Sequence, residues 1–406
     1  MPNLSILLAN EAGGGRGHVT LLAGVARALG NDLAIHAAIP SLRHADALAP
    51  ARVDRGPMLR YAPDARQDGL LAGNTSWGDY LAACGLASPE IVRAHLRWWR
   101  RKIIETDASL LVADYAPLAL WAARGLKAEG WDIEILSVGT GYGLPPARME
   151  RFPQLLPDFN RRTASEDEVF AVLNAAAASE GLQPLPTFPD VGRADRELAF
   201  TFAHLDPYAN WRQDGERFVP VLSPLTPLCS DRGTELFIYF SRRELDDPAL
   251  IEAVTELPFP RRGFFPGAST DTLERLRQGG VIVETGPLPM TEIAARARLV
   301  LSAGQHGLLC MAALAGLPQV AVPQHLEQLF HCRQADARGG LRHVPLDQRP
   351  REVITDTIRD AWSDISLHAA AHTTALELRV DYPADPLASL TAQLAPLVSR
   401  ARRAFL

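Results

Sequence analysis

In the N-terminal part of the chain, short apolar runs alternate with segments of helical periodicity. Residues 4–9 form an apolar run with the length of a buried strand, and apolar side chains then recur at helical spacing over 22–29. A second apolar run at 33–39 completes a β-α-β unit, which requires a parallel sheet. Further apolar runs at 109–113 and 133–138 add two strands to this predicted sheet.

A second series of the same kind begins after residue 230. Its strongest strand pattern lies at 235–240 and is followed by a helical segment near 246–256. Three more short strands are predicted at 281–283, 299–301 and 320–322, with helices between them. Two successive series predict an α/β chain of two Rossmann-like domains, with parallel sheets facing each other across a cleft.

The domain boundary is predicted in a polar, proline-containing stretch at 204–230. The N-terminal domain then covers residues 1–215 and the C-terminal domain covers residues 230–382. Residues 383–406 form a last helix, which we expect to return to the N-terminal domain. The total length of 406 residues fits two domains of the usual size.

Composition and charge exclude several classes of protein. With 47% hydrophobic and 22% charged residues, the chain is too apolar to be disordered. The formal net charge of −6 excludes nucleic acid as the main partner, because phosphate binding needs a basic excess. No apolar run approaches the roughly 18–20 residues that span a bilayer, so no transmembrane segment is predicted. Four widely spaced cysteines are typical of reduced thiols, and we expect a cytoplasmic protein.

A glycine-rich loop joins the first strand to the first helix. Glycine permits positive φ, and the N–H groups at a helix start point toward whatever lies before them, so such a loop forms an anion-binding nest. The glycine spacing matches neither the Walker loop nor the dinucleotide fingerprint. We assign Gly14, Gly15, Arg16 and Gly17 to a loop that binds the acceptor or a phosphate. The alternative is that these glycines only allow the turn to pack.

His18 and Asp114 are candidate catalytic residues. His18 stands at the start of the first helix, where the helix dipole favours the neutral imidazole that a general base requires. Asp114 ends another strand of the same predicted sheet, so its carboxylate should emerge at the same edge. An aspartate beside the histidine would fix its tautomer and stabilise the imidazolium. The alternative is that each residue caps a helix.

The most informative stretch of the second domain runs from 299 to 328. The loop at 302–304 opens a helix and is a second candidate anion site. Glu327 and Gln328 start the next helix, where a carboxylate and an amide side by side are suited to binding vicinal hydroxyls. A diphosphate at one helix and polyol partners one unit away describe a nucleotide-sugar site. The alternative is a packed helix between two strands.

The chain resembles the inverting nucleotide-sugar glycosyltransferases of GT-B fold, the group that includes antibiotic, flavonoid and glucuronosyl-type transferases. The resemblance spans nearly the whole chain and is strongest at 13–18, 111–114 and 288–328. It implies an N-terminal domain that binds the acceptor and a C-terminal domain that binds the sugar donor. It also implies that His18 deprotonates an acceptor hydroxyl and that Asp114 supports it. No metal and no resident cofactor are implied, since the UDP- or dTDP-type sugar is a co-substrate.

The donor motif matches that family in part. Pro323 and Glu327-Gln328 keep the ending and its spacing, and Gly304 keeps one glycine. Ser302 replaces the family's diphosphate-binding histidine, and Cys310 replaces the glutamate that holds ribose hydroxyls. We assign the donor site to the following residues: Ser241, Ser302, Gly304, Gln305, His306, Gly307, Cys310, Glu327 and Gln328.

The predicted function is therefore transfer of a sugar, with inversion, from a nucleoside diphosphate sugar to a hydroxyl-bearing small molecule or envelope precursor. Two alternatives stay open: a non-catalytic GT-B relative that binds a nucleotide or a partner, and a GT-B sugar-nucleotide epimerase. The basic aromatic segment at 97–102 is compatible with peripheral membrane contact or with an ordinary helix surface. Trp77, Tyr80, Tyr142 and Phe152 lie in acceptor-side loops, where they line a pocket or pack in the core.

Overall fold

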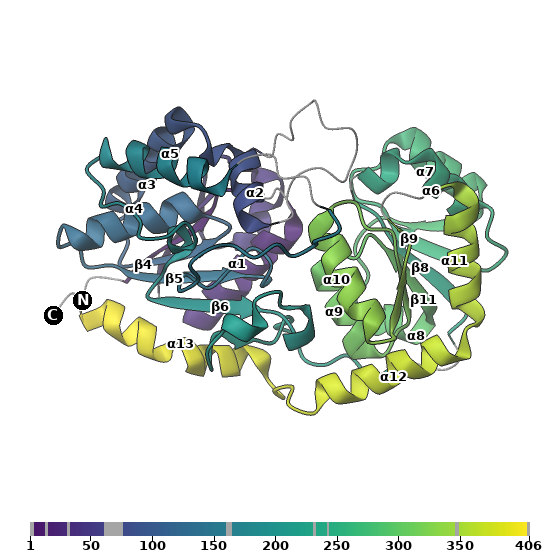
Figure 1. Ribbon diagram of the computed structural model, residues 1–406. Helices are drawn as coiled ribbons and strands as arrows, with labels where there is room; N and C mark the ends of the chain where they lie inside the picture. The colour runs from purple at the N-terminus through teal and green to yellow at the C-terminus, as the bar shows by residue number, and fades with distance from the viewer. Residues whose placement is uncertain are drawn as a thin grey trace. The chain divides into compact units, whose positions relative to one another are not determined.

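The structure is a computed structural model that describes residues 4–12, 15–30, 33–60, 76–159, 165–229, 233–241, 243–345 and 349–403. These residues form two compact units (Figure 1). Unit 1 contains the described chain up to Leu222 together with the segment from Asp385 onward, and unit 2 contains Ser223–Ala384.

Unit 1 is built on a seven-stranded sheet in the order β3-β2-β1-β4-β5-β6-β7, and all neighbouring strands are parallel. Its strands are β1 (Ser5–Asn10), β2 (Ala34–Ile39), β3 (Arg52–Arg55), β4 (Leu110–Asp114), β5 (Glu134–Gly139), β6 (Arg196–Phe200) and β7 (Arg217–Phe218). Every residue of β1 and β4 is buried, as expected for central strands covered on both faces.

Helices cover both faces of this sheet. They are α1 (Arg16–Leu29), α2 (Trp77–Leu81), α3 (Pro89–Glu105), α4 (Pro117–Ala128), α5 (Glu166–Ala178) and α13 (Pro386–Arg403). Short helical segments lie at Leu42–Leu48, Ala82–Leu86, Pro189–Gly192, Ala203–Leu205 and Ala209–Trp211. The helix pair α3–α4 packs on one face, and the pair α1–α13 packs on the other (Figure 1).

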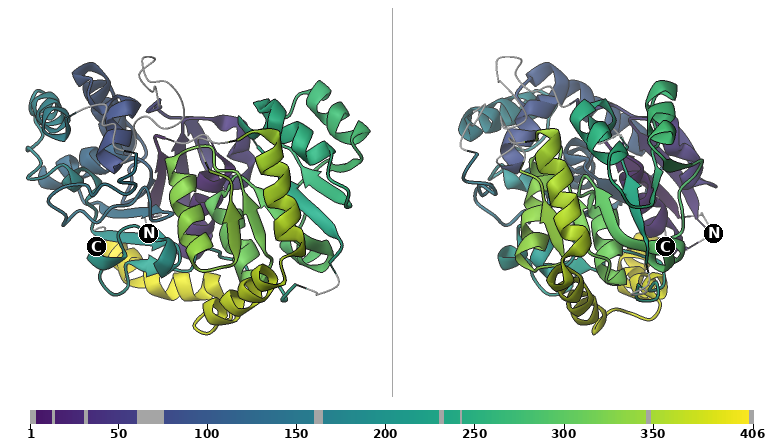
Figure 2. Two further views of the ribbon diagram at one scale, coloured as in Figure 1. Left: turned by 45° about the vertical axis from the view of Figure 1, so that its right-hand side comes forward. Right: turned by 90° about the vertical axis from the view of Figure 1, so that its right-hand side faces the viewer.

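Unit 2 is built on a six-stranded parallel sheet in the order β10-β9-β8-β11-β12-β13. Its strands are β8 (Glu235–Tyr239), β9 (Arg261–Phe264), β10 (Val281–Glu284), β11 (Ala297–Ser302), β12 (Gln319–Ala321) and β13 (Leu341–His343). Its helices are η6 (Arg243–Asp246), α6 (Pro248–Thr255), α7 (Thr270–Gln278), α8 (Met290–Arg296), α9 (His306–Ala315), α10 (Leu326–Ala337), α11 (Arg351–Ser363) and α12 (Ile365–Arg379). Figure 2 shows the strands of this sheet side by side between α11 and the pair α9–α10.

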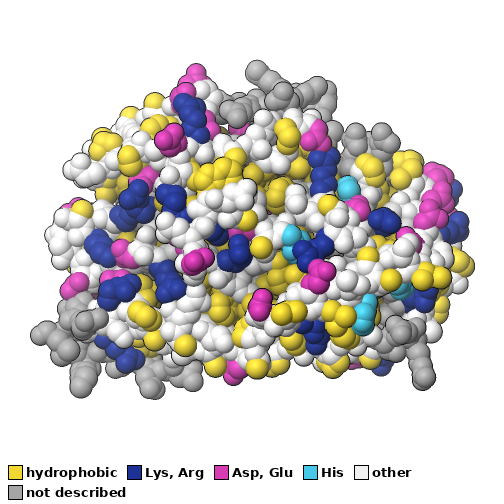
Figure 3. Space-filling view, turned by 60° about the horizontal axis from the view of Figure 1, so that its bottom comes forward, with side chains coloured by type: hydrophobic (Ala, Val, Ile, Leu, Met, Phe, Trp, Pro, Cys, Tyr) yellow, Lys and Arg dark blue, Asp and Glu magenta, His cyan; other side chains and the backbone are white. Residues whose placement is uncertain are grey.

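The predicted α/β class with two parallel sheets is confirmed. The predicted strand at 235–240 corresponds to β8, and the predicted helix near 246–256 corresponds to α6. Sequence patterns missed five short strands, each of which contains arginine: β3, β6, β7, β9 and β13. No described helix combines the length and the apolar character that crossing a membrane would require. Acidic and basic side chains are interspersed over the face drawn in Figure 3.

The C-terminal helix α13 completes the core of unit 1. Leu390, Leu394 and Leu397 are fully buried and belong to the same apolar cluster as Val25 of α1. Arg196 of β6 donates a hydrogen bond to the carbonyl oxygen of Gln393 at 2.7 Å. The sheet face covered by α1 is therefore closed by a segment from the far end of the chain.

Truncation of Leu394 to alanine tests this packing. We expect Leu394→Ala to lower the free energy of unfolding of unit 1 by about 2–5 kcal/mol, because a fully buried leucine leaves a cavity. Six of the seven tryptophans lie in unit 1, so tryptophan fluorescence during denaturant unfolding follows this unit. Thr391→Ala on the exposed side of α13 serves as the control and should change stability by about 0.5 kcal/mol or less. Equal effects of the two variants would contradict the role assigned to α13.

Candidate active site

His18 and Asp114 lie in direct contact at the carboxyl edge of the unit 1 sheet. The Nδ1 atom of His18 is 2.8 Å from Oδ2 of Asp114. The aspartate side chain is 1% exposed and the histidine side chain 21% exposed, so the pair is buried on one side and open on the other. Asp114 Oδ1 has no hydrogen-bond partner among the described residues. The histidine ring can therefore accept a proton from solvent or ligand, while its hydrogen bond to the buried aspartate fixes the orientation of the ring.

Local structure explains how these two side chains meet. Asp114 is the last residue of β4, and it pairs in register with Asn10, the last residue of β1. The Asn10 amide donates to the carbonyl oxygen of Asp114 at 2.8 Å, which secures this register. Helix α1 then starts at Arg16, six residues after the end of β1, and His18 lies in its first turn.

The start of α1 has an open N-terminus. Its N-cap, Gly15, has extended backbone and no side chain that could cap the helix, and the first turn contains no acidic residue. Arg16 and Gly17 are exposed, and nothing lies within 4 Å of the position that a Gly17 side chain would occupy. Gly14 lies outside the described residues. Exposed N–H groups at the positive end of a helix are suited to a negatively charged or electron-rich group.

Tyr115 forms an aromatic wall beside the His18–Asp114 pair. It follows Asp114 directly and adopts a left-handed backbone conformation (φ +51°), which is uncommon for a bulky residue. Its ring meets the His18 ring edge-on at 4.8 Å and the Trp77 ring edge-on at 4.9 Å, and Trp77 stacks on Tyr80. Sequence reasoning missed Tyr115, although its place at a strand end beside Asp114 was a usable signal.

An apolar pocket lies on the other side of this wall. Its lining includes Trp77, Tyr115, Leu120, Leu144, Phe152 and Val191. Trp77 and Phe152 were predicted either to line a pocket or to pack in the core, and they do both, being 4% and 3% exposed. Walls of this kind are typical of small-molecule sites, but the cavity volume of about 20 Å³ has room for only about one water molecule.

A buried carboxylate, Glu11, organises the same edge of the sheet. Its Oε1 atom accepts hydrogen bonds from Trp99 Nε1 at 2.7 Å and His95 Nδ1 at 2.8 Å. Its Oε2 atom accepts from the backbone N–H of Leu118 at 2.8 Å, at the start of α4. Sequence reasoning also missed this residue, which lies two residues after the first apolar run.

The basic aromatic segment on α3 is largely paired within unit 1. Trp99 is fully buried and bound to Glu11. Arg97 pairs with Glu180, and Arg100 pairs with Glu129. These contacts are those of an ordinary helix surface, and peripheral membrane contact stays a prediction.

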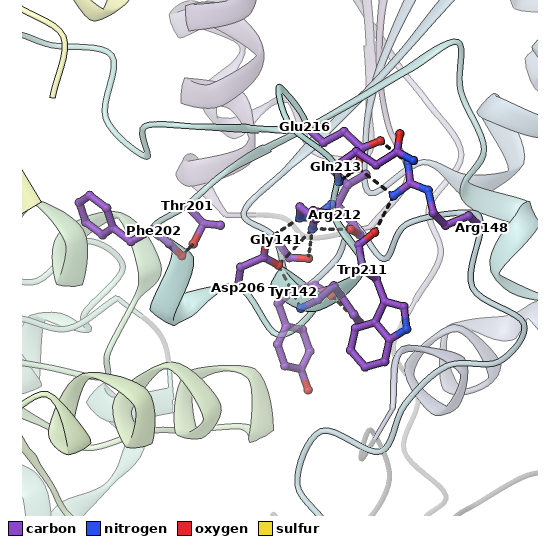
Figure 4. A network of polar contacts seen from close by, with 12 residues as sticks. Gly141, Tyr142, Arg148, Thr201, Phe202, Asp206, Trp211, Arg212, Gln213 and Glu216 are labelled. Atoms are coloured by element: carbon purple, nitrogen blue, oxygen red, sulfur yellow. Dashed lines mark hydrogen bonds and ion pairs between the residues drawn. The ribbon is translucent and has the colours of Figure 1, made fainter. Parts of the chain in front are cut away.

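The loop that follows β5 carries a polar network beside the pocket. Arg148 and Glu216 form an ion pair, and Arg212 bonds to Asp206 and to backbone carbonyls (Figure 4). Glu197 of β6 accepts a hydrogen bond from the Ala147 N–H at 3.4 Å, and its Oε2 atom has no partner among the described residues. Burial raises the pKa of the Glu197 carboxyl to about 7, and the charge of Glu216 adds to this effect, opposed by Ala147, Arg148 and Arg212.

In unit 2, the predicted diphosphate loop lies between β11 and α9. Ser302 is 1% exposed, and its hydroxyl oxygen accepts the N–H of Gly304 at 3.0 Å. Gln305 accepts the N–H of Ala303 at 3.2 Å and donates to Glu244 at 2.8 Å. The loop is thus tied to the exit of β8, the strand that precedes the half-buried Ser241. The Gln305 N-cap makes no side-chain hydrogen bond to the first turn of α9.

The first turns of α9 are more buried than the sequence indicated. Cys310 is fully buried, and its sulfur lies 3.7 Å from Nε2 of His306, which is 9% exposed. Burial raises the pKa of the Cys310 thiol. Direct donor contact through Cys310 would require rearrangement of the surrounding core, whereas nothing lies within 4 Å of the position of a Gly307 side chain. Gly304 has φ +77°, and an added Cβ would lie 2.3 Å from the Cys332 sulfur.

Glu327 and Gln328 begin α10 at the neighbouring strand exit. Gln328 accepts the N–H of Gln324 at 2.7 Å, so its amide nitrogen remains for other contacts. Glu327 is half-buried. Within the described ranges, no group of three or more His, Cys, Asp or Glu side chains is arranged to hold a metal ion.

Comparisons with known proteins identify solved structures with a similar fold. No family model and no curated protein matches the sequence. Among solved structures, the chain is similar to CalG4, the calicheamicin glycosyltransferase, with TM-score 0.67 and 17% identity over 97% of this chain and 99% of that one. It is also similar to the spinosyn rhamnosyltransferase SpnG in complex with spinosyn aglycone, with TM-score 0.66 and 20% identity over 97% and 99% of the two chains. A third similar structure is the glycosyltransferase VinC in complex with dTDP, with TM-score 0.65 and 15% identity over 98% and 100%.

These similarities define the class of fold. The chain has the GT-B fold of nucleotide-sugar glycosyltransferases over nearly its whole length. The predicted resemblance to that group is therefore confirmed at the level of fold, and the roles of the individual site residues stay predictions.

The buried Glu197 carboxyl makes the stability of unit 1 depend on pH. Its pKa of about 7 in the folded protein exceeds the ordinary value of about 4.3, so between these values the folded state keeps a proton that the unfolded chain has lost. The free energy of unfolding should therefore fall as pH rises from about 4.3 to about 7, by about 3–4 kcal/mol, and then level off. We expect Glu197→Gln to remove this contribution and to be more stable than the wild type at pH 8.

Denaturant unfolding at several pH values measures this difference. Glu150→Gln, an exposed residue in the loop that contains Ala147, should keep the wild-type dependence on pH. A constant difference in stability between Glu197→Gln and wild type from pH 4 to 8 would contradict the prediction.

Proposed function

We propose that the protein is a glycosyltransferase that moves a sugar from a nucleoside diphosphate sugar to a hydroxyl group of an acceptor, with inversion at the anomeric carbon. The observation that supports it is the His18–Asp114 pair on a GT-B fold. CalG4, SpnG and VinC are glycosyltransferases by name, and their similarity makes this activity the most direct reading of the pair.

His18 is the proposed general base. Asp114 accepts the Nδ1 proton, which leaves Nε2 as the atom that takes up the proton of the acceptor hydroxyl. The acceptor oxygen then forms a bond to the anomeric carbon as the bond from that carbon to the diphosphate oxygen breaks. The negative charge of Asp114, 1% exposed, stabilises the imidazolium that results.

The acceptor is proposed to occupy unit 1. The small pocket beside Tyr115 has apolar and aromatic walls, so an acceptor with an apolar framework and at least one hydroxyl fits its chemistry once these walls move apart to admit it. SpnG was solved in complex with spinosyn aglycone.

The donor is proposed to occupy unit 2. The N-terminal turn of α9 and the loop Ser302–Gln305 offer N–H groups and a helix dipole for the diphosphate, and VinC was solved with dTDP. Glu327 and Gln328 would bind sugar hydroxyls, and Ser241 would complete the site from the exit of β8. The proposed reaction needs neither a metal nor a resident cofactor, and it fits a cytoplasmic protein that draws on the cellular nucleotide-sugar pool.

Substitution of His18 and Asp114 tests the mechanism. We expect His18→Ala to lower kcat by about 10²–10⁴-fold, because general base catalysis contributes this much, with little change in donor affinity. Asp114→Asn should lower kcat strongly as well, because an amide can hold the wrong tautomer of His18. The measurement is nucleoside diphosphate release from a panel of UDP- and dTDP-sugars, with and without hydroxylated apolar acceptors.

Arg27→Ala, an exposed residue in the last turn of α1, at the opposite end of the helix from His18, is the control. Full activity of His18→Ala would remove His18 from the base role. Nucleotide binding by thermal shift without turnover of any donor would instead identify a non-catalytic relative. Conversion of the donor sugar without an acceptor would identify an epimerase.

A further inference from the structure

We propose that a turn behind the pocket, Gly141–Leu144, is held by the buried ion pair of Arg212 and Asp206 and positions Tyr115 against His18. Arg212 is then a positioning residue for the acceptor, acting through the turn and Tyr115. This inference rests on the proposed function where it concerns the acceptor. Its structural part, the placement of Tyr115 against His18, holds independently of the reaction.

Arg212 is buried under the turn. Its side chain is 1% exposed and that of Asp206 is 0% exposed, and the two are joined through Nε and Oδ2. The Arg212 Nη2 atom donates to the carbonyl oxygen of Leu144 at 2.7 Å and to that of Gly141 at 3.4 Å. One guanidinium therefore binds both ends of the four-residue turn, as Figure 4 shows for Gly141.

The turn has little freedom to move away from this pair. The N–H of Leu144 donates to the carbonyl oxygen of Gly141 at 3.0 Å, which closes the turn. Gly141 has φ +93°, and an added Cβ would lie 3.0 Å from Thr201 Cγ2 and 3.4 Å from Asp206 Oδ1. Tyr208 donates its hydroxyl to the carbonyl oxygen of Tyr142 at 3.2 Å. The turn is thus packed against β6 and the segment that follows it.

The Tyr115 ring packs against the opposite side of the turn, at Gly143. A Cβ built on Gly143 would lie 2.1 Å from Cε2 of Tyr115 and 2.2 Å from Cζ, so the ring occupies the space that any other residue would need. The same ring meets the His18 ring at 4.8 Å. The backbone of the turn therefore sets how closely the tyrosine ring approaches the proposed base.

A contribution to stability does not by itself explain the buried ion pair of Arg212 and Asp206. Desolvating two charges costs about as much as their attraction returns, so a buried ion pair is weak evidence for stability. Arg212 Nη1 has no hydrogen-bond partner among the described residues, which adds to the cost. What the pair does supply is a planar donor that binds two carbonyl groups in fixed directions.

Two substitutions disturb the turn from opposite sides. Arg212→Lys keeps the charge but lacks the planar fork that reaches Asp206 and both carbonyls. Gly143→Ala adds a methyl group where the Tyr115 ring lies. Both should displace the ring, although their chemistry has nothing in common.

The first readout needs no ligand. In protein with ¹³C-labelled histidine, the Cε1–H signal of His18, assigned by its loss in His18→Ala, senses the adjacent Tyr115 ring. We expect this signal to shift in Arg212→Lys and in Gly143→Ala. Arg148→Lys is the matched control, because its hydrogen bonds go to Glu216 and to the Trp211 carbonyl. Gly286→Ala in unit 2 is the second control, since its added methyl group meets no atom within 4 Å.

A double substitution separates the path through Tyr115 from other effects. Tyr115→Ala removes the ring and leaves room for the methyl group of Gly143→Ala. If the turn acts through the ring, adding Gly143→Ala to Tyr115→Ala should produce no further shift of the His18 signal. Such non-additivity is the expected signature of two groups in contact.

The second readout is kinetic and uses whichever acceptor the wild type glycosylates in the panel above. We expect Arg212→Lys to lower kcat/KM for the acceptor by about 10–100-fold, as misplacement near 1 Å can do, with the KM for the donor unchanged. Arg148→Lys should keep wild-type kinetics.

The outcomes separate the two proposals. A His18 signal that stays in place in both folded turn variants, or that shifts equally in Arg148→Lys, overturns the positioning role. Equal changes in the KM of donor and acceptor overturn it as well. A shifted His18 signal in a protein that turns over no donor supports the placement of Tyr115 and removes only the proposed reaction.

Discussion

The parallel pairing of β1 with β4 is the constraint on which the proposed active site depends. It brings Asn10 opposite Asp114, so two strands that are separated by about a hundred residues of chain end at one edge. From this edge, the loop at the end of β1 leads into α1 and His18, while β4 delivers Asp114 and Tyr115. Because side chains alternate between faces, a slip of one residue would turn Asp114 away from the histidine. The amide of Asn10 opposes that slip directly.

Several buried polar groups surround this edge, and most are satisfied by partners from other elements. Glu11 accepts hydrogen bonds from α3 and from the start of α4, and thereby joins three elements behind the glycine loop. Arg212 does the same beneath the turn after β5. A buried charge without such partners is costly, so each of these residues constrains the positions of the elements it joins. Buried polar contacts therefore support the pocket and Tyr115 within a unit whose core is otherwise apolar.

Unit 2 carries a loop of a different kind. The candidate diphosphate loop between β11 and α9 is held by hydrogen bonds between neutral groups, which include those of Ser302, Gly304 and Gln305. Gln305 also donates a hydrogen bond to the carboxyl group of Glu244. The seryl hydroxyl is occupied as an acceptor and retains its proton for donation. The side chains of Cys310 and His306 are in contact and are buried in the core beneath α9. An anion at this loop would be bound chiefly by backbone N–H groups and the helix dipole, which suits the modest net charge of the chain.

The sequence alone predicted two parallel sheets, although not all of their strands, and it placed His18 and Asp114 at one edge of the first sheet, because apolar runs, helical periodicity and strand ends are local patterns. It did not reveal Glu11, Tyr115 or Arg212, nor the complete burial of Cys310. The contacts that give these residues their roles join positions far apart in the chain, such as Glu11 with Trp99 and Arg212 with Leu144. Even α13, predicted as a helix, acquires its partners only when the core of α1 forms. Local propensity determines which elements form, whereas the polar partners of a buried group are decided by tertiary packing, since only the folded chain removes that group from water.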